Sequence, residues 1–254
     1  MNALIVGANK QPLSKFLPDK FLVIDDGNFI DALDLPERKS IVRFDVAEHS
    51  FNPLKDMDYR RAREFVAVLD AVFPEGESTL TARRSRFQIL EALLAKPKAL
   101  SRLIADTKDT EDAYQKIQTL LLSPVLERVL DNPTNFSFKG TIVARLDRAL
   151  LGDFDCFVLA NLLISQYPGV VVIPDFGFYA TRFHVSLIRQ NRLIAGIGSF
   201  DELPHMKHHL VQIERKLGSR CTPADADILA TYSGILPGTN AYNDFVERNI
   251  GSLT

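Results

Sequence analysis

The chain has 254 residues, of which 46% are hydrophobic and 24% charged, and its formal net charge is -2. This composition is that of an ordinary globular protein with enough apolar residues for a substantial core, and it excludes a disordered chain. Because the net charge is close to zero, no overall basic field draws the protein to nucleic acid or to anionic membranes, so such binding requires a local patch.

The cysteine content and the N-terminal residues predict the compartment. Cys156 and Cys221 have no partner at metal-ligand spacing, which favours two free thiols in a reducing compartment over a disulfide. The first residues have the pattern of a strand rather than that of a signal peptide, and no apolar run approaches the ~20 residues that cross a bilayer. We therefore expect a cytoplasmic protein without a membrane-inserted segment.

The first part of the chain predicts strands, and the middle part predicts helices. Short apolar runs at 2–6, 21–24 and 40–46 are typical of the start of an α/β sheet. From Ala62 onward the apolar residues recur with a 3.6-residue period, which predicts a block of helices. This block, at 57–133, is expected to be an all-α insertion between strands.

One helix of this block, predicted over 81–95, has a basic side. Its apolar positions, expected to face inward, are Phe87, Leu90, Leu93 and Leu94. Its basic positions, expected to face outward, are Arg83, Arg84 and Arg86. Arginines on a helix face commonly serve solubility and ion pairing. The functional alternative for these three is a surface that contacts the phosphate backbone of DNA.

Strands and helices alternate after the helical block. Apolar runs at 141–146, 170–173 and 193–197 predict strands, and helices are expected between them over 154–167 and 184–192. Continuous apolar strands alternating with helices favour a parallel sheet that is covered on both faces. A further helix is expected to begin after Thr222 and to end near Gly234.

The segment that follows the first strand has the position of a phosphate-binding loop. It reads GANKQPLS, whereas the working pattern is G-x-x-x-x-G-K-[ST]. Gly7 and Ser14 match the pattern, but Pro12 replaces the second glycine and Leu13 replaces the lysine. Proline lacks the N–H that such a loop offers to phosphate, and leucine lacks the cation. Taken alone, the segment is more typical of a plain turn than of a phosphate-binding loop.

A second candidate site lies at the end of the run VVVIPD. A buried strand that ends on an acid, here Asp175, is how P-loop folds place a magnesium ligand. Phe176 stands where a catalytic carboxylate would follow, so we expect no general base there. An ordinary loop acid is the alternative for Asp175. No grouping of His, Cys, Asp or Glu in the sequence predicts a metal site of another kind.

Several segments, in order, resemble the HerA/FtsK-type P-loop ATPases, especially conjugative coupling proteins and viral genome-packaging ATPases. They are HSFNPL at 49–54, the helical block, TIVARL at 141–146, VVVIPDFG at 170–177, LIAGIGSF at 193–200 and RCTPADADILATYSG at 220–234. The predicted helix with Arg189 and Arg192 resembles the arginine-containing helix of that family. The resemblance implies an α/β fold over 1–254, a parallel-sheet P-loop NTPase-like (RecA-like) core with the insertion at 57–133.

This chain departs from the family at three parts of one site. Leu13 replaces the Walker A lysine, Asp175–Phe176 replaces the Walker B acid pair, and Gly198–Ser199 stands where the sensor strand usually carries glutamine. The resemblance therefore implies a degenerate site. Its nucleotide-binding positions are Gly7, Lys10 and Ser14, and its catalytic positions are Asp175 and Arg192.

Three functions are compatible with these patterns. The first is a catalytically degenerate HerA/FtsK-like homologue that serves as a structural or adaptor subunit of a DNA-translocation, conjugation or genome-packaging machine. It would work without a nucleotide cofactor, in an oligomer or beside a partner ATPase, and would bind DNA weakly and non-specifically. The second is an active DNA-translocating ATPase that uses ATP and magnesium with Asp175 and either Lys10 or Lys15. The third is a nucleotide-independent interaction domain.

Overall fold

The structure is a computed structural model of the chain, and it describes only part of the sequence. The described residues are 2–6, 17–26, 41–73, 80–107, 111–181, 183–197, 214–217, 230 and 234–251. Among them, no helix is long and apolar enough to cross a membrane.

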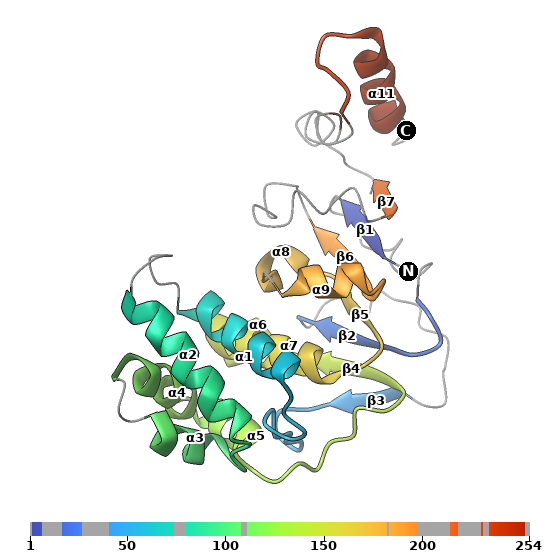
Figure 1. Cartoon of the computed structure of the whole chain (residues 1–254). Helices are drawn as coiled ribbons and strands as arrows, with labels where there is room; N and C mark the ends of the chain where they lie inside the picture. Colours follow the sequence, from blue (N-terminus) through green and yellow to red (C-terminus); the bar gives the residue numbers. More distant parts are fainter. Residues whose placement is uncertain are drawn as a thin grey trace. The chain divides into compact units, whose positions relative to one another are not determined.

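Strands open the chain, helices follow, and the two then alternate (Figure 1). The strands are β1 (Ala3–Val6), β2 (Phe21–Asp25), β3 (Ile41–Phe44), β4 (Thr141–Arg145), β5 (Val170–Ile173), β6 (Leu193–Ile197) and β7 (Glu214–Leu217). The helices are α1 (Tyr59–Val72), α2 (Leu80–Leu94), α3 (Leu100–Thr107), α4 (Glu111–Leu122), α5 (Pro124–Leu130), α6 (Arg148–Leu151), α7 (Asp153–Gln166), α8 (Phe176–Tyr179), α9 (His184–Arg189) and α11 (Asn240–Gly251).

The strands form one sheet in the order β3-β4-β2-β5-β6-β1-β7. The five strands from β2 to β7 in that order pair in parallel, as the alternation of strands and helices predicts. Each of the six apolar runs that predict a strand contains one within its described residues, β1 to β6, which confirms the predicted α/β class. β7 was not anticipated, because its sequence ERKL has no apolar run and it pairs only with β1 at one side of the sheet.

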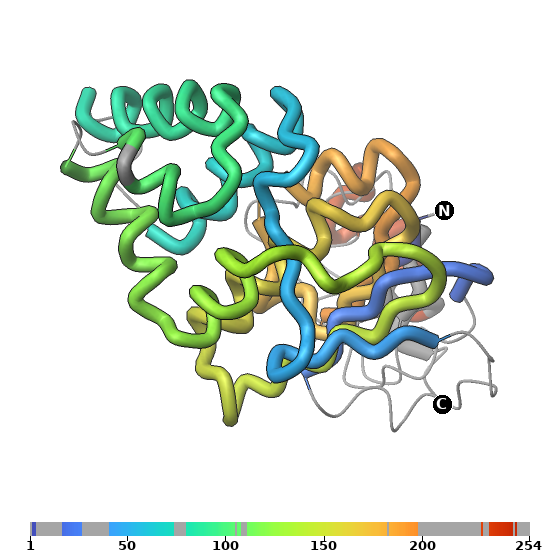
Figure 2. The backbone as a smooth tube through the Cα atoms, turned by 90° about the horizontal axis from the view of Figure 1, so that it is seen from below, coloured from blue at the N-terminus to red at the C-terminus, as the bar shows by residue number. Residues whose placement is uncertain are grey.

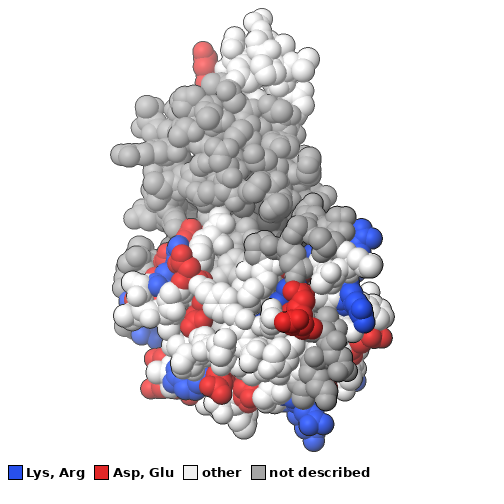
Figure 3. All heavy atoms as spheres, turned by 90° about the vertical axis from the view of Figure 1, so that its left-hand side faces the viewer, with Lys and Arg blue, Asp and Glu red and all other residues white. Residues whose placement is uncertain are grey.

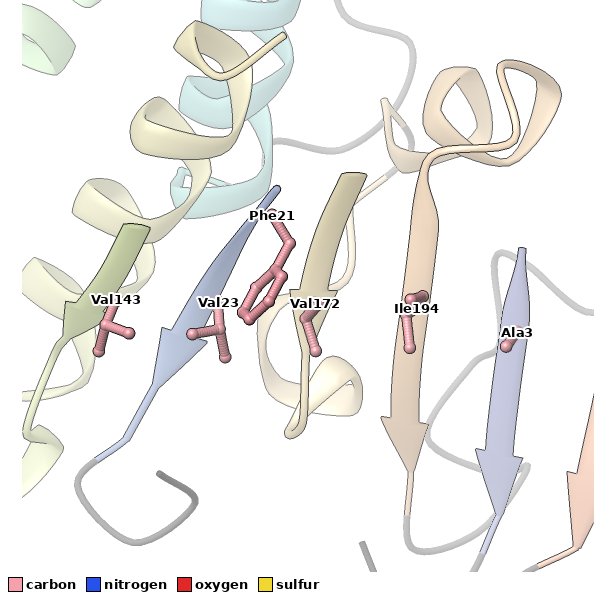
Figure 4. Close-up of a cluster of buried hydrophobic side chains, with 6 residues drawn as sticks. All are labelled: Ala3, Phe21, Val23, Val143, Val172 and Ile194. Atoms are coloured by element: carbon pink, nitrogen blue, oxygen red, sulfur yellow. The ribbon is translucent and has the colours of Figure 1, made fainter. Parts of the chain in front are cut away.

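A row of apolar side chains runs across the middle of the parallel sheet. Val23 pairs with Val172, Val172 pairs with Ile194, and Ile194 pairs with Ala3. All four side chains are at most 1% exposed, and Figure 4 shows them side by side from neighbouring strands. Phe21 and Val143 complete this buried cluster. Since a shift by one residue would turn every one of these side chains to the other face, the row fixes the register of the strands.

The chain divides into two compact units. The first comprises 1–41, 140–143 and 169–254, and contains the parallel strands with α8 and α9. The second comprises 42–139 and 144–168. Within the second unit α1 packs on α2 and α7, while α2 packs on α3 and α4, as Figures 1 and 2 show. Helix α7 is buried along most of its length, as its almost uniformly apolar sequence predicts.

The orientation expected for α2 is wrong at two positions. Phe87 and Leu94, predicted to face inward, are 58% and 39% exposed. The buried face of the helix is instead formed largely by small residues, among them Ala82, Ser85 and Ala92. Small side chains allow neighbouring helices to approach closely, and the largest apolar side chain of α2 is thereby left outside.

The side chain of Asn2 connects the first strand to the segment that precedes β6. Its Oδ1 accepts a hydrogen bond from the Leu193 backbone N–H at 3.0 Å, and its Nδ2 donates to the carbonyl of Ile188. Nδ2 also donates to Oδ1 of Asn191 at 3.2 Å. Asn2 is 5% exposed, so these bonds satisfy backbone groups that water does not reach.

We predict that Asn2→Ala lowers the free energy of unfolding by about 1–3 kcal/mol, because it leaves the buried Leu193 N–H without its acceptor. Chemical denaturation of the two proteins measures the difference. Asn191→Gly is the matched control: it removes the outer contact with Asn2 and suits the positive φ of 56° at this position. If both variants lose the same stability, the buried amide of Asn2 has no special role.

Candidate functional site at the carboxyl ends of the parallel strands

Three parallel strands end side by side at the position where the sequence predicts the site. Val6, the last residue of β1, pairs with Ile197, the last residue of β6. Ile173, the last residue of β5, pairs with Ala195, so that Asp175 follows two residues beyond this pair. Neighbouring strands lie about 4.8 Å apart. The chain segments that leave β1, β5 and β6 therefore leave from one edge, which is where ligands bind in open α/β sheets.

Asp175 occupies the turn between β5 and α8. It is half-buried, and it precedes α8 as the N-cap residue without a side-chain capping hydrogen bond. Asp25 and Asp26 were not predicted to belong to the site, although β2 is the parallel neighbour of β5 and ends on Asp25. The signal was visible: FLVIDD, like VVVIPD, is a buried strand followed by acids.

Phe176 points away from solvent. It is 1% exposed, and its ring lies 5.3 Å from the ring of His184 on α9. Helix α8, which begins with Phe176, packs on β6. The position that would carry the second Walker B acid therefore belongs to the core of the first unit. A carboxylate at this position would be a buried charge, which is costly without a paired cation.

His184 is completely buried beneath this turn. Its Nδ1 accepts a hydrogen bond from the Thr181 N–H at 2.9 Å, so the neutral ring carries its proton on Nε2. Within the described part of the chain Nε2 has no hydrogen-bond partner. The ring packs against Phe176 and against Phe183, whose centroid lies 4.3 Å away. Burial lowers the pKa of His184 to about 3, so this histidine is neutral at physiological pH.

Arg192 lies at the opposite end of β6 from this edge. The sequence places it on a helix, which is wrong, because α9 ends at Arg189 and the chain turns through Asn191 with a φ of 56°. The Arg192 guanidinium donates from Nε to the Gly169 carbonyl at 2.9 Å, next to the start of β5. Since β6 is five residues long, its two ends lie about 16 Å apart. Asp175 and Arg192 of one chain are therefore not brought together.

The three arginines of α2 have different surroundings. Arg83 and Arg84 are exposed, whereas Nε of Arg86 lies 2.8 Å from the Asp70 carboxylate of α1 and is engaged in an ion pair. Figure 3 shows the face at the left of Figure 1, where α2 lies, with acidic and basic side chains interspersed over its described part. A continuous basic surface is absent from the described residues of this face. Nucleic-acid binding by Arg83, Arg84 and Arg86 stays a prediction.

The phosphate-loop positions lie outside the described residues. These are Gly7, Lys10, Pro12, Leu13, Ser14 and Lys15, and the same holds for Gly198–Ser199 and for 220–229. The expected end of the helix predicted after Thr222 does lie within the described part, and α11 follows it as a helix that was not predicted. Gly234 has a φ of 73°, and the Ile235 N–H bonds to the carbonyl of Ala230, as at a glycine-terminated helix. The described residues contain no group of three or more His, Cys, Asp or Glu that could hold a metal ion.

The comparisons with known proteins identify the fold. The chain superposes on the solved structure of VirB4 of Thermoanaerobacter pseudethanolicus with a TM-score of 0.62, over 92% of this chain and 81% of that one. The chain has the fold of VirB4. At 10% sequence identity the likeness to VirB4 shows the fold alone, and it confirms the predicted parallel-sheet, P-loop NTPase-like class. No protein-family model matches the sequence, and no curated protein sequence matches it.

We predict that a carboxylate cannot be introduced after Asp175 without loss of stability. Phe176→Glu is expected to lower the free energy of unfolding by about 3–5 kcal/mol, because it removes a buried ring and buries a charge. Phe176→Leu, the matched control, is expected to cost about 1–2 kcal/mol. Urea denaturation at neutral pH measures both. A Phe176→Glu protein as stable as Phe176→Leu would show that the side chain at this position can turn toward solvent.

We also predict that His184 makes the protein sensitive to acid. Its folded-state pKa of about 3 lies below the ordinary value of 6.5, so the unfolded chain binds the proton more tightly. The neutral ring makes its full contribution to the free energy of unfolding above pH 6.5. Between pH 6.5 and pH 3 this contribution falls by up to about 1.4 kcal/mol per pH unit. His184→Gln keeps an acceptor for Thr181 and cannot be protonated, so it should flatten the stability profile in this window. An unchanged slope in urea titrations from pH 7 to 4 would contradict the assignment.

Proposed function

We propose that this protein is a catalytically degenerate P-loop ATPase homologue that acts as a structural or adaptor subunit of a DNA-translocating machine of the conjugation type. The observation that carries the proposal is the Asp175–Phe176 turn. It stands at the acid-bearing edge of the P-loop ATPase fold, yet its second residue is packed into the core. The shared fold with VirB4, a P-loop ATPase of conjugation machinery, supports the class of machine.

The residues of the edge do not fit a catalytic magnesium–ATP site. The hydrolysis of ATP in this fold relies on a lysine in the phosphate loop and on carboxylates that hold magnesium and orient water. This chain has Leu13 instead of the lysine, and Phe176 offers no carboxylate after Asp175. Arg192, at the other end of β6, is too far from Asp175 to supply the missing cation in the same chain. We therefore expect that this protein does not transfer phosphoryl groups.

We predict that the isolated protein releases no phosphate from saturating ATP and magnesium at a rate near 1 s⁻¹, the lower end of common enzyme turnover. Magnesium–ATP is also expected to leave its melting temperature unchanged, because a ligand that does not bind the folded state does not stabilise it. A turnover near 1 s⁻¹ that Asp175→Ala abolishes would contradict the proposal and favour an active ATPase.

Variants of the phosphate loop distinguish the effect of the missing N–H at Pro12 from that of the missing cation at Leu13. Pro12→Gly with Leu13→Lys recreates the working pattern and should give a melting temperature that rises with magnesium–ATP. Pro12→Gly with Leu13→Met is the matched control, which restores the backbone N–H but not the cation. Equal responses of both variants would show that the lysine is not what this loop lacks.

The adaptor role is tested in the native cell. A tagged chain is expected to co-purify with an ATPase whose own phosphate loop retains its lysine, because the proposed machine needs an intact motor. Recovery of the tagged protein without such a partner, under conditions that preserve DNA-translocation complexes, would favour the nucleotide-independent interaction domain.

A further inference from the structure

Helix α2 presents a stripe of large side chains on its outer side. Leu80 is 83% exposed, Phe87 58% and Leu94 39%, and these three residues follow one another at intervals of seven. Residues seven apart lie almost above one another on an α-helix, which turns once in 3.6 residues. Arg83, Arg84 and Glu91 are exposed on the same side. We call these six residues the outer stripe of α2.

An exposed apolar row of this kind lies along one side of the helix, where a second helix can cover it. Scattered apolar residues are common on protein surfaces, whereas these three are aligned, with one apolar residue per heptad where a full coiled-coil seam has two. The inner face of α2 already packs on α1, α3 and α4. The outer stripe is therefore a second packing face of the same helix.

The outer stripe is complementary to itself when two copies of α2 run antiparallel. Leu80 and Leu94 each lie seven residues from Phe87. A two-fold axis at Phe87 therefore places Leu80 of each copy opposite Leu94 of the other copy. The two Phe87 rings then meet at the axis. Residues equidistant from the centre always face each other in such an isologous contact.

The charges of the outer stripe follow the same symmetry. Arg83 and Glu91 each lie four residues from Phe87, on opposite sides of it. In the antiparallel pair Arg83 of one copy therefore faces Glu91 of the other, twice per contact. In a parallel pair in the same register, Arg83 would face Arg83 and Glu91 would face Glu91, which repels. The charge pattern thus favours a second copy in one orientation.

We infer that the outer stripe of α2 is a docking surface for a second copy of this chain in an antiparallel, two-fold arrangement. Phe87 is its centre, the two leucines flank it, and the Arg83–Glu91 pairs set its direction. The helix is about 22 Å long, so the contact covers less than the ~800 Å² per partner of a standard interface. A weak dimer is expected, with a Kd on the order of 10–500 µM.

The sequence also allows a second role for this face, which is to contact the phosphate backbone of DNA. The residues of the outer stripe suit that role only in part. Arg83 and Arg84 are suited to phosphate, but Glu91 repels it and the three apolar side chains gain nothing from it. Arg86 is already paired with Asp70. The test must therefore distinguish self-association from binding to nucleic acid.

The first measurement is sedimentation of the full chain over a concentration series. The series extends to ~500 µM, the range of Kd expected for a small interface. Wild-type protein should form a dimer, and Phe87→Ser should raise the Kd at least tenfold. Leu150→Ser is the matched control, because Leu150 on α6 is 81% exposed but lies outside the stripe. A wild-type monomer at the highest concentration, or equal effects of both variants, would overturn the inference.

A charge exchange tests the pairing of Arg83 with Glu91. Arg83→Glu and Glu91→Arg should each weaken the dimer, since each places like charges opposite one another. The double variant should restore the wild-type Kd. If the double variant is as weak as the single ones, these residues do not face each other, and the antiparallel arrangement is wrong.

Cross-linking determines the relative direction of the two α2 helices. The cysteine variants are made in a Cys221→Ser background, which leaves only the buried Cys156. Phe87→Cys should oxidise to a disulfide-linked dimer on its own. Leu80→Cys should cross-link only when mixed with Leu94→Cys, because disulfide formation requires Cα atoms within about 7 Å. Cross-linking of Leu80→Cys alone would overturn the inference. So would a monomer that binds duplex DNA with a salt dependence lost in Arg83→Ala and Arg84→Ala.

Discussion

The cross-strand row of Val23, Val172, Ile194 and Ala3 is the constraint on which the site depends. These side chains come from four strands that are separated in the sequence by as many as 191 residues, yet they lie next to one another in a buried line. Once this line is fixed, the strands have no freedom to slide, because a shift of one residue would turn its side chains to the opposite face of the sheet and out of this packing. The ends of β1, β5 and β6 must then meet at one edge, and that edge is the candidate site.

The turn after β5 shows how the core and the site depend on each other. Phe176 and His184 share one buried cluster, in which a neutral histidine holds the Thr181 N–H and packs against two aromatic rings. A working P-loop ATPase needs polar, charged groups at such an edge, whereas this chain uses one position of the turn for packing. Under the proposed function, the absence of a lysine at Leu13 and of an acid at Phe176 would be consistent with each other, since neither group functions without its counterpart.

Some parts of the site were predictable from the sequence and some were not. VVVIPD predicts a buried strand with an acid at its end, and β5 with Asp175 agrees, because a continuous apolar run has no other place than the core. Arg192 was expected on a helix and beside the site, but it lies past the end of α9 and at the other end of β6. No proline or glycine interrupts the sequence from His184 to Arg192, and the turn at Asn191, with its positive φ, ends the helix earlier.

The sequence by itself determined the apolar strands, the main helices and their order, and it places Leu13 and Phe176 without charge, because apolar runs, their period and residue identity are local properties. Tertiary structure alone decided which element ends lie side by side and which side of α2 is buried. The sequence of α2 has two apolar faces. The face with the small residues is the buried one, since small side chains let α1, α3 and α4 pack closely against it. Phe87 is therefore left on the outside, although its hydrophobicity alone would place it within.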